Sequence, residues 1–160
     1  KLSRIMRTTL ENTYREFNTI EEEIGFLENY LQLHLPDNAE YKITVDTSIE
    51  ATEVMIPSML IQPFIENSIV HGLTGIGYAG VLSIQFSLDQ QALLIRISDN
   101  GRGFSDTNES THVSRGGQII ADRLYLLAKQ YRAKATYSIT SGSEQSGVTA
   151  LIRLPLITKA

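Results

Sequence analysis

Three side chains that could do chemistry stand close together in the otherwise apolar segment 60–72. Asn67 and His71 are four residues apart and would share one face of a helix, with Glu66 about 100° away around the axis. A helix that is apolar nearly all round is buried, and a buried carboxylate needs a partner. The pattern indicates either one wall of a ligand pocket or a polar edge that faces solvent, with His71 near the negative end of the helix dipole.

A second candidate site begins where Asp99 ends an apolar strand and precedes Gly101 and Gly103. The carboxylate could accept a hydrogen bond from an amino group such as that of adenine. Glycines let the backbone turn sharply and approach a ligand closely. The alternative is an Asp-Asn-Gly turn that simply ends the strand.

Two weaker candidates are glycine motifs. Gly116 and Gly117 precede a predicted helix that contains Arg123, and the free N–H groups at a helix start can hold a phosphate; the alternative is a flexible loop. Gly147 stands two residues before Thr149, whose hydroxyl could contact a ligand at the start of the last long strand.

Apolar periodicity predicts the helices that position these residues. It predicts helix over residues 1–35, in which Thr19 caps a second amphipathic run with Glu21, Glu22 and Glu23 solvated in its first turn. A buried helix is predicted from Pro57 to His71, with Pro57 in the first turn, where a missing N–H costs nothing. A loop is predicted over 100–117 and a helix over 118–131.

Alternating patterns predict strands near 41–46, 80–88, 92–98, 135–140 and 147–154. The second and third of these form a hairpin around Asp89-Gln90-Gln91. The order of elements predicts a two-layer α/β sandwich, which is one mixed sheet with helices packed on one face.

Bulk properties narrow the class of protein. The 160 residues suit one domain, and the net charge of −4 argues against a general nucleic-acid binder. Without cysteine there are no disulfides or thiolate metal sites. No apolar run approaches the roughly 20 residues that span a bilayer. Because the sequence starts at Lys1 rather than methionine, a fragment of a longer protein is expected.

Residues 57–72 resemble the Pro-x-x-Leu-x-Gln-Pro-Leu-Val-Glu-Asn-Ala-x-x-His-Gly box of LytS-type sensor histidine kinases. All four clusters follow the order and spacing of the ATPase superfamily that these kinases share with DNA gyrase, heat-shock chaperones and mismatch-repair proteins. Upstream, residues 21–24 and Tyr30-Leu31 are similar to the region between the family's dimerisation helix and its ATPase domain. The resemblance implies a Bergerat-type ATP-binding fold over residues 37–160, preceded by the end of the dimerisation helix and a linker helix over 1–36.

The resemblance also implies a role for the polar candidates. Asn67 would coordinate a Mg²⁺ ion that bridges the ATP phosphates. Glu66 would be the acidic neighbour that serves as general base or positions water, and His71 would face the phosphates. Asp99 would receive the adenine amino group.

The remaining roles concern the glycines and two departures from the family pattern. The resemblance implies that Gly101 and Gly103 shape the pocket floor, that Gly116 and Gly117 hinge the lid over ATP, and that further nucleotide contacts come from Arg123 and Thr149. Ser114 and Ile119 replace residues of the usual lid motif, and Val148 replaces the threonine that usually follows the last glycine. These replacements put the lid contacts and the last hydroxyl contact in question.

The function implied is transfer of the ATP γ-phosphate to a histidine. None of His34, His71 and His112 has the family's Pro-His-Phe-x-Phe-Asn context, so the acceptor is expected upstream, outside this fragment. The expected partners are that dimerisation segment, a response regulator and a second copy in a homodimer. Direct binding of nucleic acid is not expected. The expected location is a cytoplasmic domain of a membrane-anchored kinase. The alternatives are a degenerate nucleotide-binding scaffold without kinase activity and, disfavoured by the box at 57–72, a hydrolytic ATPase of the gyrase or chaperone branch.

Overall fold

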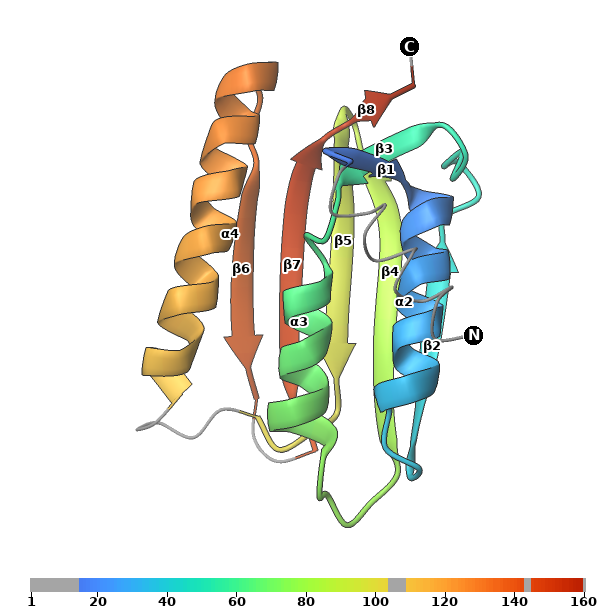
Figure 1. Cartoon of the computed structure of the whole chain (residues 1–160), viewed down its shortest axis with the longest axis vertical. Coiled ribbons are helices and arrows are strands. Elements are labelled where there is room, and N and C mark those ends of the chain that lie inside the picture. Colours follow the sequence, from blue (N-terminus) through green and yellow to red (C-terminus); the bar gives the residue numbers. More distant parts are fainter. Residues whose placement is uncertain (1–14, 104–108, 143–144, 160) are drawn as a thin grey trace.

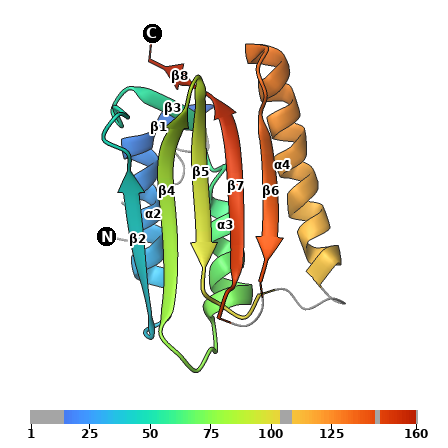
Figure 2. The same cartoon turned by 180° about the vertical axis from the view of Figure 1, so that it is seen from behind.

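The computed structural model describes residues 15–103, 109–142 and 145–159, and within 109–116 only the backbone. A five-stranded sheet in the order β2-β4-β5-β7-β6 carries α2, α3 and α4 on one face (Figures 1 and 2). Its strands are β2 (Ala39–Val45), β4 (Gly80–Asp89), β5 (Ala92–Asp99), β6 (Thr136–Ser141) and β7 (Val148–Pro155). The predicted two-layer sandwich is confirmed. The helix predicted over residues 1–14 lies outside the described residues.

The sheet is mixed, as the order of elements predicted. β2 pairs with β4 in parallel, whereas the pairs β4–β5, β5–β7 and β6–β7 are antiparallel. The predicted hairpin joins β4 to β5, with Gln90 at φ 56° in its turn. β5 therefore lies in the middle of the sheet, and its last residue, Asp99, emerges at one end between β4 and β7.

The core fills the space between the sheet and its helices. Alternate residues of β4 and β5 face the helices because side chains alternate along a strand. The helices contribute apolar residues at three- and four-residue spacing. Fully buried members from both layers include Leu82, Ile84, Phe86, Ile95, Ile20, Leu27, Leu31, Ile61 and Ile65.

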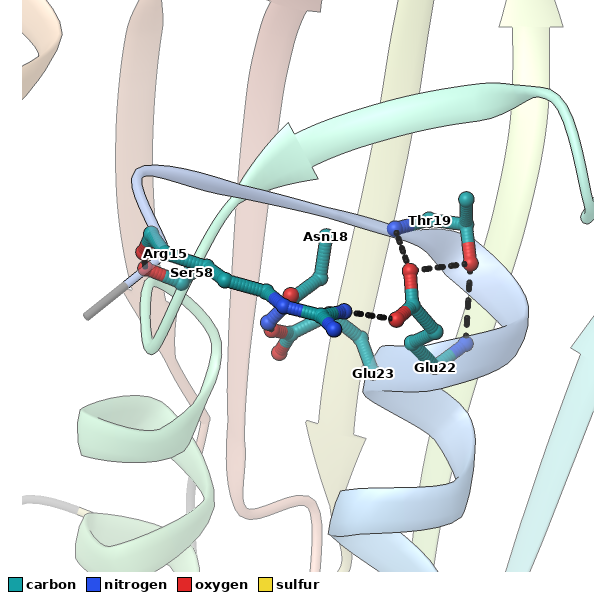
Figure 3. A network of polar contacts seen from close by, with 6 residues as sticks. All are labelled: Arg15, Asn18, Thr19, Glu22, Glu23 and Ser58. Atoms are coloured by element: carbon teal, nitrogen blue, oxygen red, sulfur yellow. Dashed lines mark hydrogen bonds and ion pairs between the residues drawn. The ribbon is translucent and has the colours of Figure 1, made fainter. Parts of the chain in front are cut away.

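The helix α2 (Ile20–His34) starts where the sequence predicts, with Thr19 as its N-cap. The Thr19 hydroxyl accepts a hydrogen bond from the Glu22 backbone N–H at 3.1 Å, and the Glu22 carboxylate accepts one from the Thr19 backbone N–H at 3.0 Å (Figure 3). This capping box satisfies two backbone donors that a helix start otherwise leaves without partners.

The prediction that Glu21, Glu22 and Glu23 are all solvated is wrong for Glu23, which is 1% exposed. Its carboxylate accepts a hydrogen bond from the Asn18 side chain at 2.7 Å (Figure 3). Burial raises the pKa of Glu23, while the hydrogen bonds from Asn18 and the Met59 backbone, and the charge of Arg123, lower it. The local pattern missed this because the cover over Glu23 comes from segments far away in the sequence.

One of these partners, Asn18, lies in a small second sheet in the order β1-β3-β8, which was not predicted from the sequence. Its strands are β1 (Phe17–Thr19), β3 (Val54–Pro57) and β8 (Ile157–Thr158). Strands this short show little alternation, and their pairing, such as Thr19 with Met55, joins residues 36 apart or more.

The helix predicted from Pro57 starts later. Pro57 ends β3, Met59 adopts a left-handed φ of 62°, and α3 (Gln62–Asn67) begins with Pro63 in its first turn. Proline is tolerated there because the first N–H groups of a helix have no intrahelical partner. The chain then continues as the π-helix η1 (Ser68–Leu73). The prediction that a proline lies in the first turn of this helix was right, but that proline is Pro63 rather than Pro57.

The helix α4 (Glu109–Tyr131) begins nine residues before the predicted start at residue 118. Gly116 and Gly117 therefore lie inside the helix rather than in a loop before it. Glycine costs a helix interior roughly 1 kcal/mol relative to alanine, and here the packing of Ile120, Leu124 and Leu127 against the core outweighs that preference. None of the helices in the described ranges is long and apolar enough to cross a membrane.

The two neighbouring glutamates predict opposite pH dependences of stability. The pKa of Glu23 is raised by burial, so its contribution is fully present below its unfolded pKa and is lost as pH rises. The pKa of Glu22 is lowered, chiefly by its hydrogen bond from the Thr19 backbone, so its contribution is fully present above its unfolded pKa and is lost as pH falls. The unfolding free energy of the wild type minus that of Glu23→Gln should therefore fall as pH rises from about 4 to 7. The difference from Glu22→Gln should rise between about pH 3 and 5 and stay constant above that range.

Urea denaturation of the wild type and both variants at several pH values measures the two differences. Glutamine does not titrate, and it retains the acceptor that each hydrogen bond needs. Parallel trends for the two variants would contradict the opposite environments assigned to the two carboxylates.

Candidate functional site

A cleft opens between the α3–η1 helix and the sheet, at the end where β5 finishes. The α3–η1 helix provides Asn67 and His71, and both residues line the cleft, as their four-residue spacing predicted. Both side chains are exposed, so they form the rim of the cleft rather than its floor. Among the described residues, the lining is Phe64, Asn67, Ser68, His71, Gly72, Ile97, Asp99, Gly103, Ile139, Val148 and Ala150.

Asp99 is a buried carboxyl group in this cleft, at 5% exposure. Its Oδ1 accepts a hydrogen bond from the Gly101 backbone N–H at 2.9 Å. Its Oδ2 is buried and has no hydrogen-bond partner in the described part of the chain. Burial raises the pKa of Asp99, and hydrogen bonding by Gly101, Ser68 and Val148 opposes that rise. The site therefore presents one unused acceptor at the closed end of an apolar cleft.

Three glycines surround Asp99 because no side chain would fit beside it. A Cβ on Gly72 would lie 2.9 Å from Asp99 Oδ1, one on Gly101 would strike the Gly72 backbone, and one on Gly147 would strike the Asp99 carbonyl oxygen. Gly103 has a φ of 73°, in the left-handed region that favours glycine. The predicted role of Gly101 and Gly103 in shaping the site thus has a steric basis in the structure.

Glu66 is next to Asn67 in sequence but does not belong to the cleft lining. It is exposed, and its Oε1 accepts a hydrogen bond from the Gln62 side chain at 3.2 Å. Its charge acts with burial to raise the pKa of Tyr30 on α2. Glu66 therefore lies on the side of α3 that is nearer α2.

Two further predicted nucleotide contacts lie away from the lining. Arg123 donates from Nη2 to the Ser58 carbonyl oxygen at 2.7 Å. Thr149 lies between Val148 and Ala150, which both line the cleft, so strand alternation turns its side chain to the opposite face. Gly116 and Gly117 lie in α4, and neither belongs to the described lining.

Ser68 and the apolar walls of the cleft were not predicted from the sequence. Ser68 is a buried hydroxyl at 8% exposure whose hydrogen bonding lowers the pKa of Asp99. A serine directly after Asn67 in an apolar helix was the available signal. The wall residues Phe64, Ile97 and Ile139 resemble core residues in any sequence pattern, and only the fold shows that they border a cleft.

No group of three or more His, Asp or Glu side chains converges on a possible metal position within the described ranges. The rim offers the Asn67 carboxamide oxygen as one hard oxygen ligand. Mg²⁺ is usually bound through one or two protein ligands together with substrate phosphates and waters. The donors present therefore fit a Mg²⁺ ion that arrives with a phosphate-bearing ligand, and they do not form a complete protein site.

Comparison with known proteins finds similarity to bacterial sensor kinases. It is 31% identical over 109 residues to the sensor protein LytS of Oceanobacillus iheyensis, covering 66% of the chain and 18% of that relative. It is 30% identical over 137 residues to the sensor histidine kinase YpdA of Escherichia coli, covering 85% of the chain and 24% of that relative. The chain thus spans a quarter or less of these two relatives. No family model matches it.

Solved structures agree on the fold. The histidine kinase domain of the blue-light activated histidine kinase of Erythrobacter litoralis superposes with a TM-score of 0.64 at 17% identity, covering 89% of the chain and 64% of that domain. The mycobacterial sensor histidine kinase MprB superposes with a TM-score of 0.56 at 15% identity, covering 90% of the chain and 99% of that structure. The chain is a homologue of LytS-type sensor histidine kinases, and it has the fold of a histidine kinase catalytic domain.

Proposed function

We propose that the chain binds ATP in the cleft next to Asp99 and provides the γ-phosphate that a sensor histidine kinase transfers to a histidine outside this fragment. The observation that carries the proposal is the buried Oδ2 of Asp99, which has no hydrogen-bond partner among the described residues. An unsatisfied buried acceptor costs about 1–3 kcal/mol. A ligand that brings a donor to this position removes that cost.

Adenine matches the cleft in shape and in hydrogen bonding. It is a flat, largely apolar ring, and the walls are the side chains of Ile97, Ile139, Val148 and Ala150. Its exocyclic amino group is a donor that can reach Asp99. Guanine carries a carbonyl oxygen at the matching position and would place an acceptor against a carboxylate.

The rim of the cleft suits the phosphates. With adenine at Asp99, the phosphates extend toward the exposed side chains of Asn67 and His71. The Asn67 carboxamide would hold Mg²⁺ together with the phosphates, and His71 would contact the phosphates directly. Bound Mg²⁺ supplies neutralisation of the charge that develops during phosphoryl transfer.

Glu66 is the candidate general base or water-positioning group in this proposal. It directly precedes Asn67 in α3 but lies outside the cleft lining, and its carboxylate accepts a hydrogen bond from the Gln62 amide. Its exposed position suits a group that acts on an incoming acceptor side chain more than one that contacts the adenine. The acceptor histidine, a dimerisation segment, a response regulator and a membrane anchor belong to this proposal as parts of the complete kinase.

An ATP titration by isothermal calorimetry, with and without Mg²⁺, tests the function directly. Binding that Mg²⁺ strengthens supports the kinase proposal. No measurable binding of ATP under either condition would leave a signalling scaffold without nucleotide as the better description of the domain.

Asp99→Asn should weaken ATP binding by about ten- to hundredfold, because hydrogen bonds to charged groups contribute about 1.5–3 kcal/mol. The wild type should also bind ATP more tightly than GTP. Asp89→Asn is the matched control, because Asp89 also ends a strand but is exposed and pairs with Arg153 at 2.9 Å. Equal affinity of the wild type for ATP and GTP would show that Asp99 does not read the base.

Asn67→Ala should remove the part of ATP affinity that depends on Mg²⁺ and leave the fold intact, because Asn67 is exposed and lies at the rim. Calorimetry with and without Mg²⁺ measures the difference, and Asn29→Ala on the exposed face of α2 is the control. If the variant still gains affinity from Mg²⁺ as the wild type does, Asn67 is not the metal ligand.

A further inference from the structure

Gly117 is a glycine for a reason that its sequence motif does not suggest. It lies inside α4, where a Cβ would come within 2.9 Å of the Tyr137 hydroxyl. That hydroxyl donates a hydrogen bond to the Gly117 carbonyl oxygen at 3.2 Å. Gly25, also within a helix, offers a contrast, because a Cβ there would have no neighbour within 4 Å. The glycine at position 117 therefore makes room for a specific neighbour.

Tyr137 connects this point of α4 to the proposed nucleotide cleft. It lies on β6, where Ile139, two residues further along the same face, is part of the cleft lining. The Tyr137 ring packs edge-on against Phe64, with ring centroids 5.8 Å apart and an interplanar angle of 68°. Phe64 is 4% exposed and also lines the cleft. One half-buried side chain thus touches both the cleft wall and the backbone of α4.

We propose that Tyr137 is a positioning residue for nucleotide binding, whose ring holds Phe64 in the cleft wall and whose hydroxyl fixes α4 at Gly117. The proposal rests on the proposed function, because the ligand it serves is ATP. Tyr137 itself does not line the cleft, so it acts through Phe64 and α4. Glycine at position 117 is what allows the hydroxyl to approach the helix backbone.

A double-mutant cycle between positions 117 and 137 tests the contact. A methyl group at 117 pushes the Tyr137 hydroxyl away and tilts its ring against Phe64, so Gly117→Ala should weaken ATP binding by about tenfold, the loss expected for roughly 1.4 kcal/mol. Tyr137→Phe loses one hydrogen bond and should weaken it by about threefold. Because phenylalanine leaves space for the methyl group, adding Gly117→Ala to Tyr137→Phe should cause no further loss.

The measurements are the Kd for Mg·ATP by calorimetry and the unfolding free energy by urea denaturation, for the wild type, both single variants and the double variant. Gly25→Ala controls for the effect of alanine in a helix, and Tyr125→Phe controls for loss of an exposed hydroxyl on α4. Neither control should change the Kd. Should Gly117→Ala fail to fold, Tyr137→Phe and the double variant still give the comparison.

Rescue of the ATP affinity of Gly117→Ala by Tyr137→Phe supports the positioning role. An equal effect of Gly117→Ala in both backgrounds would overturn it, and so would a cycle in which unfolding free energies change while every Kd stays at the wild-type value. If the wild type binds no ATP, the proposed function fails and this inference fails with it. If the wild type binds ATP and all variants bind it with the same Kd, this inference is wrong and the proposed function stands.

Discussion

The burial of one carboxylate constrains the site more than any other interaction in the structure. Asp99 lies where three backbone segments converge, and each approaches it through a glycine: Gly72 in the last turn of η1, Gly101 after β5 and Gly147 before β7. A side chain at any of these positions would collide with the carboxylate or with the backbone next to it. Burying a carboxylate with one unused oxygen is unfavourable in the free protein, and this cost makes the cleft selective. A ligand with a donor at that position recovers the cost, whereas a ligand with an acceptor there adds to it.

Strand register determines where that carboxylate points. Leu82 on β4 lies opposite Asp99, and Ser98 of β5 lies opposite Thr149 of β7. A slip of one residue in either pairing would exchange the faces of the strand and turn Asp99 away from the helices. The apolar alternation of β4 and β5 prevents such a slip, because it would expose Ile95 and Ile97 and bury Arg96. The same packing that stabilises the core therefore fixes the chemistry at the end of β5.

The sequence was sufficient for the features that local rules govern. Five long strands, the Thr19 cap and the shared face of Asn67 and His71 follow from alternation, capping chemistry and helical period. Features that depend on contacts between distant segments were not predictable in this way. The surroundings of Glu23 include the Met59 backbone and Arg123, which are distant in sequence. The choice between Pro57 and Pro63 as the helix start depends on whether residues 54–57 find strand partners. The glycine pair at 116 and 117 predicted a loop because glycine disfavours helix, but the reason for glycine at 117 is the Tyr137 hydroxyl, which arrives from β6.

Arg123 does not line the cleft, but it contacts the turn that leads into the α3–η1 helix. Its guanidinium donates to the Ser58 carbonyl oxygen, and the Ser58 backbone N–H donates to the Glu16 carbonyl oxygen at 3.0 Å. Ser58 and Met59 lead into α3. This turn is therefore the meeting point of three segments, which are α4, the chain at residue 16 and the start of the α3–η1 helix. Burial lowers the pKa of Arg123 and the charge of Glu23 raises it, so the half-buried guanidinium and the buried carboxylate each favour the charged form of the other. The arrangement therefore specifies where α3 begins relative to α4, and with it where Asn67 and His71 stand relative to Asp99.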